Sequence, residues 1–302
     1  MGSIRAFMFH DIRDLEDTKY PERYKLKSFL RRNQFEFQIS KIMSKYQIIS
    51  SLDIKKIDLN NNIDYAVLTF DDGLRDHYYV YNYLKSLNIS GTFFIPRKPI
   101  IENIVMDTHK IQFLLSVTNE NDLTNEILNL FSEKTEIWEK YSKTKWKNNW
   151  WTEEMIFITN FLRNHEGNNI NRYELINFLF EKYVTKNHTQ ISKDLYLTES
   201  QINEMSINGM VIGGHGDFSE NLLLVKSYKS EIDNSYEFVS KYSDTFVFSY
   251  PNGGFNDEIK SYLEYKNCFS SYTIKPLTIT DLDVIDYMEF PRYDSPQIIE
   301  LP

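Results

Sequence analysis

Two adjacent carboxylates, Asp71 and Asp72, follow a short apolar run in the stretch AVLTFDDG, residues 66–73. A short apolar run that ends at a turn signal is typical of a strand buried on both faces. The aspartates are therefore expected at the carboxyl end of that strand, the edge where α/β sheets and barrels carry their active sites. Neighbouring strand residues point to opposite sides, which predicts divided roles: one carboxylate binds a metal and the other acts as a base. Asp-Asp-Gly is also frequent in turns, so these residues alone leave a plain loop open.

The sequence after the aspartates completes a strand–helix–strand unit. Residues 74–88 are expected to form a helix, and GTFFIP, residues 91–96, a second buried strand. The motifs TFDDG, ending at Gly73, and GTFF resemble the NodB-homology polysaccharide deacetylases, a family of metal-dependent carbohydrate amide and ester hydrolases. The resemblance implies that Asp71 is the general base and that Asp72 ligates the metal.

A later strand, expected over residues 210–214, ends at His215. In the resembling family this strand ends in His-x-x-x-His, because side chains four residues apart can hold one metal. His215 matches the first histidine, but the second position is Ser219, and a hydroxyl is a poor zinc ligand. The resemblance therefore supplies two matched ligands, Asp72 and His215, whereas catalytic zinc normally has three protein ligands and an open position.

Several groups are candidates for the missing metal ligand: His10, Asp217, Glu220, His109, or a water molecule held by Ser219. The resemblance implies a divalent cation, with zinc as the first choice and cobalt, manganese or nickel as alternatives. We expect weaker binding than in a complete site, and a harder metal that accepts oxygen and water ligands becomes possible.

A further strand is expected over TFVFSYP, residues 245–251, and its end is similar to the family's aromatic-Pro-x-Gly strand end. The resemblance implies that the backbone N–H of Tyr250 helps to hold the tetrahedral oxyanion, with Pro251 beside the substrate. Many members carry an arginine one position before this tyrosine to orient the base, where this chain has Ser249.

Arg292, in the late segment EFPRYD, is our candidate to replace the missing arginine. It would pair with Asp71 and keep that carboxylate ionised. A salt bridge elsewhere on the rim is an equally open interpretation.

The motifs also do not identify a general acid. The family's usual C-terminal histidine would lie in a Leu-x-His segment, and this sequence has none. The expected first strand, residues 4–12, carries His10 and Asp11, and a similar His-Asp pair opens some family members. A histidine at a strand end is often only structural, but here it would lie at the same rim as the aspartates. We take His10 as the preferred acid and His109 as the rival.

After the second motif strand, the alternation of strands and helices stops for about a hundred residues. We predict a helical insertion over residues 97–195 within a single barrel domain, residues 1–302. Asp107 is expected to start a helix. His109, in its first turn, either has no role or reaches the site, and Trp151 either faces sugar or packs between helices. An insertion at this rim would set substrate selectivity.

The bulk composition excludes some classes of protein. With 43 acidic and 34 basic residues among 302, the formal net charge of −9 argues against nucleic acid as the main partner. One cysteine, Cys268, excludes a disulfide framework and a cysteine-rich zinc site. No signal-peptide pattern and no apolar run of transmembrane length occurs, which predicts a cytoplasmic protein acting on a glycan precursor.

These observations predict an α/β fold, a distorted (β/α) barrel of about seven strands with a helical insertion. The predicted function is metal-dependent removal of an N-acetyl or similar acyl group from a sugar in a surface glycan or its precursor. The alternative is a catalytically impaired barrel that binds glycan or a partner protein. A third possibility is hydrolysis of a formyl group or a non-sugar amide.

Overall fold

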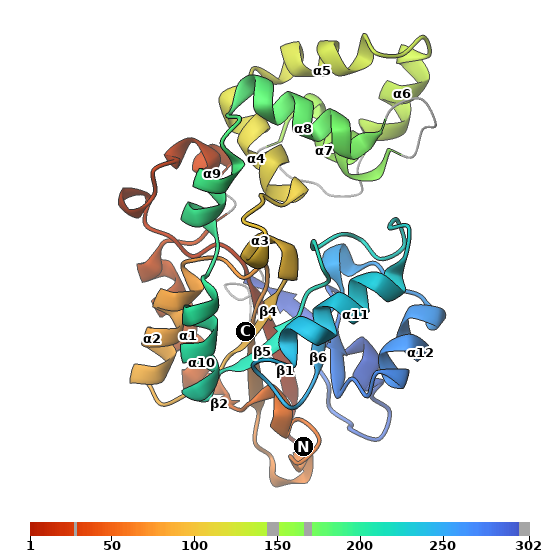
Figure 1. The fold of residues 1–302 in the computed structure, drawn as a ribbon. Coiled ribbons are helices and arrows are strands. Elements are labelled where there is room, and N and C mark those ends of the chain that lie inside the picture. Colours follow the sequence, from red (N-terminus) through yellow and green to blue (C-terminus); the bar gives the residue numbers. More distant parts are fainter. Residues whose placement is uncertain (27–28, 144–150, 166–170, 296–302) are drawn as a thin grey trace. The chain divides into compact units, whose positions relative to one another are not determined.

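The computed structural model describes residues 1–26, 29–143, 151–165 and 171–295 (Figure 1). It divides into two compact units, each described by itself. The first comprises residues 1–17, 29–104 and 192–302, and the second comprises residues 18–28 and 105–191.

The first unit contains a nearly closed barrel of parallel strands, as predicted. Its order is β7-β6-β5-β4-β3-β1-β8, and the short β2 pairs with the start of β3. A bridge between Tyr272 and Phe290 brings the chain just before β8 beside β7, which nearly closes the ring. The strands are β1 (Ile4–Phe9), β2 (Gln47–Ile48), β3 (Tyr65–Phe70), β4 (Thr92–Ile95), β5 (Val211–Gly214), β6 (Val247–Ser249), β7 (Ser270–Tyr272) and β8 (Arg292–Asp294).

The register of the central strands aligns their carboxyl ends. β1 and β3 pair from Ile4 opposite Tyr65 to Phe9 opposite Phe70, so both strands stop at the same level. β4 and β5 pair as far as Ile95 opposite Gly214. Because the strands are parallel, the residues that follow them emerge at one end of the barrel.

Period-two alternation separates an inner face from an outer face along each strand. Inside, Val67, Phe94 and Tyr272 belong to one buried apolar cluster. Outside, the rings of Phe9, Phe70 and Phe93 stack in a row, with centroids 5.3 and 4.8 Å apart. Continuing this alternation past the ends of β3 and β5 places residues 71 and 215 on the inner side.

Helices cover the outer face of the strands. In Figure 1, α1, α2 and α10 lie on one side of the barrel, and α11 and α12 lie on the other. None of the described helices is long and apolar enough to cross a membrane. The helices of this unit are α1 (Arg32–Lys45), α2 (His77–Ser86), α3 (Arg97–Ile101), α10 (Glu199–Ile207), α11 (Tyr228–Val239) and α12 (Asp257–Tyr265).

The second unit has its own apolar core, in which Leu114, Phe161 and Leu179 are almost completely buried. Helices occupy much of the described part of residues 97–195, but the compact unit has bounds other than those of the expected insertion: it begins at Val105 and takes in residues 18–28. Its helices are α4 (Asp107–Val117), α5 (Glu120–Leu128), α6 (Lys134–Tyr141), α7 (Glu153–Asn164) and α8 (Arg172–Tyr183), and α9 (His188–Leu195) leads back to the first unit.

Candidate active site

Asp71 lies one residue beyond β3 and inside the barrel. Its backbone N–H donates to the carbonyl of Phe9 at 3.0 Å, which extends the pairing with β1 by one residue. This keeps Asp71 in strand geometry, and its side chain is buried. The predicted strand end is therefore present.

A fully buried arginine holds the Asp71 carboxylate in a bidentate contact. Nη1 of Arg292 donates to Oδ1 and Nη2 donates to Oδ2, each at 2.8 Å. The arginine is fixed in turn by its Nε, which donates to the carbonyl of Thr273 at 2.9 Å, and by Nη1, which donates to Thr69 Oγ1 at 3.1 Å. The contact proposed from the sequence between Arg292 and Asp71 is present.

Ser249 occupies the position where the resemblance led us to expect an arginine, and its small side chain joins the same pair. The Ser249 hydroxyl accepts from Arg292 Nη2 at 2.8 Å and donates to Asp71 Oδ2 at 3.3 Å. Arg292 comes from β8 instead of β6, so its guanidinium reaches the base from a different strand.

The charges around Asp71 favour its ionised form. Burial raises the pKa of this carboxyl group, but the nearby charges of Arg292, His215 and His10 and the hydrogen bonds from Arg292 lower it by more. The resulting pKa lies well below the usual range of an aspartate. Asp71 is therefore a carboxylate at neutral pH and can accept a proton.

Asp72 turns away from the strand path in a left-handed backbone conformation, with φ of 78°. Such a conformation is strained for a residue other than glycine, and it occurs preferentially at functional sites. Gly73 continues the turn with φ of 59°. The turn brings Asp72 Oδ1 to 3.5 Å from Nε2 of His215 and to 3.3 Å from the Ser219 hydroxyl, which donates to it.

The tautomer of His215 follows from its second nitrogen. Nδ1 lies 3.1 Å from the carbonyl of Ser249. A carbonyl can only accept, so Nδ1 carries the proton and the lone pair of the neutral ring is on Nε2, toward Asp72. Metal-ligating histidines are usually oriented in this way, with the remote N–H donated to a carbonyl or carboxylate.

The donor atoms around Asp72 can be compared with what a divalent cation requires. The Nε2 lone pair of His215 and the Asp72 carboxylate face each other at 3.5 Å, a separation that suits two ligands of one cation, since each would lie about 2.1 Å from the metal. The third nearby donor is the Ser219 hydroxyl. In the described part of the chain, no group of three or more His, Cys, Asp or Glu side chains is arranged to hold a metal. The donor set therefore fits a cation with two strong ligands and a weak third.

Among the residues considered for the missing ligand, Asp217 is engaged elsewhere. Its carboxylate accepts from Arg97 at 2.8 Å and from Asn234 at 3.0 Å, and it lies 3.3 Å from the ammonium of Lys98. These contacts hold the turn after β5 rather than supply a metal ligand. Metal ligation by His10, Glu220 or His109 stays a prediction.

A half-buried carboxylate on α11 shapes the same turn. Glu231 accepts from the backbone N–H groups of Asp217 at 2.8 Å and Phe218 at 3.2 Å. The turn needs two left-handed residues, Gly216 with φ of 73° and Ser219 with φ of 57°. Glu231 thus stabilises the turn that carries Ser219, a role that no sequence motif indicated.

His10 follows β1 at the same end of the barrel as the aspartates. Burial lowers the pKa of its imidazole, but the carboxylates of Asp71, Asp72 and Asp294 raise it by more, so the pKa lies above its usual value. A protonated imidazole at this place could donate a proton. The carbonyl of His10 accepts from Nε2 of His77 at 2.9 Å, so a second histidine fixes this part of the backbone.

The predicted oxyanion donor, the backbone N–H of Tyr250, is engaged in the sheet. It donates to the carbonyl of Tyr272 at 3.1 Å. The phenol is also buried and donates to the carbonyl of Met288 at 2.9 Å. Pro251 follows at the rim and is buried. An oxyanion role for Tyr250 stays a prediction, and it requires the N–H to be shared with Tyr272.

Three residues predicted to contact substrate belong to the second unit. Asp107 is the first residue of α4, as expected, and its carboxylate pairs with Lys110 at 3.0 Å. His109 is buried in the same helix, and Trp151 precedes α7. Their roles at the site stay predictions.

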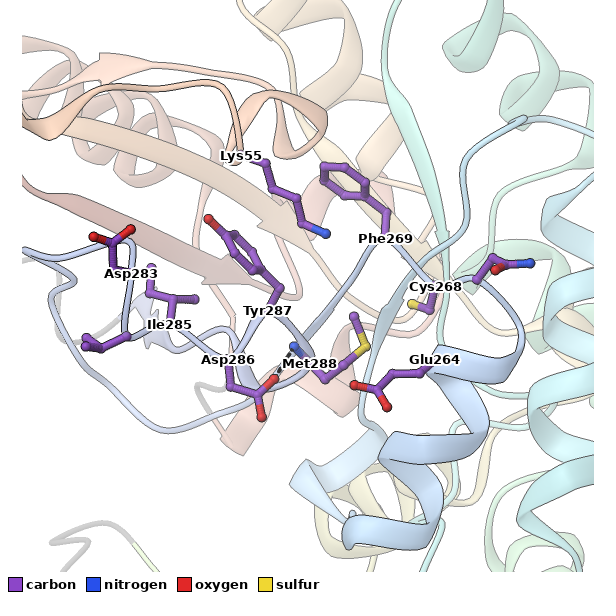
Figure 2. Close-up of a pocket in the computed structure, with 11 residues that line it drawn as sticks. Lys55, Glu264, Cys268, Phe269, Asp283, Ile285, Asp286, Tyr287 and Met288 are labelled. Atoms are coloured by element: carbon purple, nitrogen blue, oxygen red, sulfur yellow. Dashed lines mark hydrogen bonds between the residues drawn. The ribbon is translucent and has the colours of Figure 1, made fainter.

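A shallow pocket of about 840 Å³ lies at the other end of the barrel (Figure 2). It is lined by Phe269, which precedes β7, and by Tyr287, which precedes β8. The ammonium of Lys55 lies over both rings, 4.3 and 4.7 Å from their centroids. Since Asp71 and His215 follow their strands, this pocket is separate from the candidate site.

Comparison with solved structures identifies the fold. A deacetylase from Streptococcus pyogenes, PplD, matches with a TM-score of 0.56 at 15% identity, covering 99% of this chain and 96% of that one. IcaB from Ammonifex degensii matches with a TM-score of 0.57 at 10% identity, covering 99% and 95%. The BpsB deacetylase domain from Bordetella bronchiseptica matches with a TM-score of 0.51 at 11% identity, covering 97% and 95%. This chain has the polysaccharide deacetylase fold. No family model matches the sequence, and no curated protein matches it either.

The fold confirms the barrel implied by TFDDG and GTFF. Sequence reasoning missed the anchors around the site: the hydroxyl of Ser249, the carboxylate of Glu231 and the imidazole of His77. The contact between Thr69 and Arg292 could have been anticipated. The alternation that places Asp71 inside the barrel also places Thr69 inside, where its hydroxyl can accept from the same arginine. Glu231 gave no detectable signal, because a glutamate on an amphipathic helix is indistinguishable from a solvated one.

His77 generates a prediction about stability. Burial lowers the pKa of its imidazole to about 4, from 6.5, so the unfolded state binds more protons between these values. Stability must therefore fall as pH falls through this window, by about 3 kcal/mol from this group. We expect His77→Gln, which keeps a donor for the His10 carbonyl but cannot titrate, to remove that part of the loss. Urea unfolding at several pH values measures it, with His188→Gln as the control; equal acid sensitivity in His77→Gln and the native protein would contradict the prediction.

Proposed function

We propose that this protein is a metal-dependent polysaccharide deacetylase that removes an N-acetyl or similar acyl group from a sugar of a surface glycan or its precursor. The observation that carries the proposal is one arrangement at the carboxyl ends of the barrel strands. An arginine-paired carboxylate, Asp71, stands beside a carboxylate and an imidazole, Asp72 and His215, that face each other at 3.5 Å. The fold relative PplD, itself a deacetylase, was solved in complex with acetate, the acid that N-acetyl hydrolysis releases.

In this proposal Asp71 is the general base. It accepts a proton from the attacking water, which requires an ionised carboxylate with a fixed direction. The lowered pKa provides the first requirement, and the two hydrogen bonds from Arg292 provide the second. Arg292 acts through Asp71 and is a positioning residue.

Asp72 and His215 would hold the cation, with Ser219 as a weak third donor or as the holder of a water. A bound divalent cation would polarise the acyl carbonyl and stabilise the developing negative charge. His215 presents Nε2 because the Ser249 carbonyl fixes its tautomer. Zinc is the first choice, and cobalt, manganese and nickel are alternatives that suit a site richer in oxygen ligands.

The remaining roles concern the leaving group and the oxyanion. His10, with its raised pKa, would donate the proton that the departing amine needs, and His109 is the alternative acid. The backbone N–H of Tyr250 would support the oxyanion if it shared its hydrogen bond to the Tyr272 carbonyl with the substrate.

We place the reaction in the cytoplasm, on a precursor of the glycan.

A barrel that only binds glycan or a partner is the second candidate. The weak third ligand, Ser219, favours it. The buried pair of Asp71 and Arg292 does not, because a buried ion pair contributes little net stability compared with apolar residues of similar volume. A binding module has no evident use for it, whereas a general base does.

Replacing the base tests the proposal directly. Asp71→Asn should lower the rate of acetate release from N-acetylated glycan fragments at least about a hundredfold, because general-base catalysis contributes on the order of 10²–10⁴. Coupled detection of acetate measures the rate, with formylated sugars and a non-sugar amide tested in parallel. The matched control is Asp53→Asn, a surface residue. Unchanged hydrolysis by Asp71→Asn would refute the assignment.

Removing Arg292 should shift the pH dependence. Asp71 must be ionised to act, and in the native protein its low pKa keeps it so across the acidic range. Without the guanidinium, burial raises this pKa, so Arg292→Gln should lose activity from the acidic side first and regain it as pH rises. The acidic limb of kcat/KM should move upward by at least about one pH unit. Arg31→Gln, on the surface, is the control, and an unmoved acidic limb would count against the base assignment.

Restoring a histidine at position 219 tests the cation site without relying on activity. We expect Ser219→His to bind zinc at least about tenfold more tightly than the native protein, because a strong third ligand replaces a hydroxyl. Histidine tolerates the left-handed backbone found there better than most residues. Isothermal titration with zinc alone measures the change, with Ser219→Ala as the control. Equal zinc affinity in Ser219→His and Ser219→Ala would argue against a cation between Asp72 and His215.

A further inference from the structure

The left-handed backbone of Asp72 has to be held by other parts of the chain. Its φ is 78°, and a residue other than glycine keeps such a conformation only where the surrounding structure fixes it. The contacts with His215 and Ser219 are made by the Asp72 carboxylate, not by its backbone. The support for the backbone therefore comes from the residues that follow Asp72.

These residues pair with the segment that begins at the end of α9. Residues 73–75 run antiparallel to residues 195–197, with a bridge at the centre of the pair. The N–H of Leu197 donates across the pair at 3.0 Å and the N–H of Arg75 at 2.7 Å. Both segments belong to the first unit, and we refer to them as the turn ribbon. Two strands this short are only marginally stable by themselves, so the turn ribbon needs a further link.

A buried arginine supplies that link at one end of the turn ribbon. Nε of Arg13 donates to the carboxylate of Asp76, which follows the first segment. Nη1 donates to the carboxylate of Asp194 at 3.1 Å and Nη2 to the carbonyl of the same residue at 2.9 Å. Asp194 precedes the second segment, and all three side chains are buried. The guanidinium of Arg13 thus joins the two segments where their pairing stops.

The charges explain why a cation is needed at this place. In the antiparallel register Asp76 falls opposite Asp194, and like charges directly opposite each other are destabilising. Burial raises the pKa of Asp76 to about 6, although the charge of Arg13 lowers it. Arg75 also approaches Asp194, but at 3.8 Å and with a side chain that is 54% exposed, so solvent screens this contact. Without Arg13, the two carboxylates would push the segments apart.

Arg13 can serve as a fixed point because its own backbone is held. Its N–H donates to the carbonyl of Leu30 at 2.8 Å, and the N–H of Leu30 donates to the carbonyl of Asp11 at 2.9 Å. His77, the first residue of α2, adds a second link to the same segment, since its Nε2 donates to the carbonyl of His10 at 2.9 Å. The segment after β1 therefore anchors the turn after β3.

We propose that Arg13 is a positioning residue for Asp72. By closing the turn ribbon, it holds the backbone conformation in which the Asp72 carboxylate faces His215. This inference rests on the proposed function, in which these two residues hold the cation. Loss of the guanidinium would let the ribbon open and the strained turn relax, so the two ligands would no longer be held at the separation that a cation requires.

The base next to this turn is held by other contacts. The N–H of Asp71 donates to the carbonyl of Phe9 at 3.0 Å, and its carboxylate is bound by Arg292. Removal of Arg13 should therefore disturb Asp72 and leave Asp71 in place. A merely structural role would instead weaken the whole barrel, so the difference between the two aspartates separates the two interpretations.

Hydrogen exchange of single backbone amides in Arg13→Gln tests this difference. The full chain is measured by NMR in EDTA, with the amides of Arg75 and Leu197 as reporters of the turn ribbon and the amide of Asp71 as the reference. Relative to the reference, both reporters should exchange at least about tenfold faster than in the native protein, because local opening exposes them while the strand pairing stays closed.

Lys260→Gln is the matched control. Lys260 bridges the carboxylates of Asp286 and Glu289, both at 2.6 Å, beside the pocket of Figure 2 at the other end of the barrel. Its removal should leave the exchange ratio unchanged. Thermal unfolding verifies that each variant folds. Asp194→Asn, which keeps the volume of the side chain and weakens its contact with the guanidinium, must show the same selective pattern if Arg13→Gln does not fold.

Calorimetric titration of the metal-free full chain with zinc alone measures the effect on the ligands. Arg13→Gln should bind zinc at least about tenfold more weakly than the native protein, and Arg13→Lys should recover part of the loss because it keeps the charge. Equal acceleration of reporters and reference, or unchanged zinc affinity despite faster reporters, overturns the inference. Faster reporters in Arg13→Gln, with no zinc bound by the native protein, would overturn the proposed cation site alone.

Discussion

The guanidinium of Arg292, enclosed in the barrel, is the interaction on which the site depends. A buried arginine requires a carboxylate and further acceptors, because an unpaired charge in the interior is strongly destabilising. Asp71 supplies the carboxylate, and Thr273, Thr69 and Ser249 supply the remaining oxygen atoms. The same pairing fixes the direction of Asp71 and keeps it ionised. One electrostatic requirement of the fold therefore produces an oriented, ionised carboxylate.

The barrel brings these groups together by its register. Parallel strands that stop at one level release their next residues at one edge, and period-two alternation decides which of them face inward. Asp71 and His215 obey this rule. Asp72, its neighbour, would face outward, and only the left-handed turn at φ of 78° brings its carboxylate toward His215. The backbone strain is confined to Asp72, because the next residue of the turn is Gly73, which adopts its φ of 59° without steric cost.

The sequence was most informative where local chemistry and tertiary position coincide. The apolar run before Asp71 predicted β3 because burial on both faces demands continuous apolar residues, and the two motifs indicated the barrel. The pairing of Arg292 with Asp71 could only be suspected from the missing arginine at Ser249, since 221 residues separate the partners and closure of the barrel is what brings them together. The hydrogen bonds of Glu231 and Asp217 at the turn after β5 could not be predicted for the same reason. They depend on how helices pack, which no local sequence pattern encodes. The participation of residues 18–28 in the second unit likewise arises from long-range packing.

The two serines at the site have different consequences. Ser249 leaves room for a guanidinium from another strand. Arg292 fills that space and makes two hydrogen bonds to Asp71, so the expected arginine contact is supplied from elsewhere in this chain. Ser219 donates to Asp72 and offers no comparable replacement for a histidine ligand. The arrangement thus orients Asp71 by two hydrogen bonds, whereas it would offer a cation only two strong ligands. Under the proposed function, such a site would require sufficient metal and would depend more on substrate contacts for alignment.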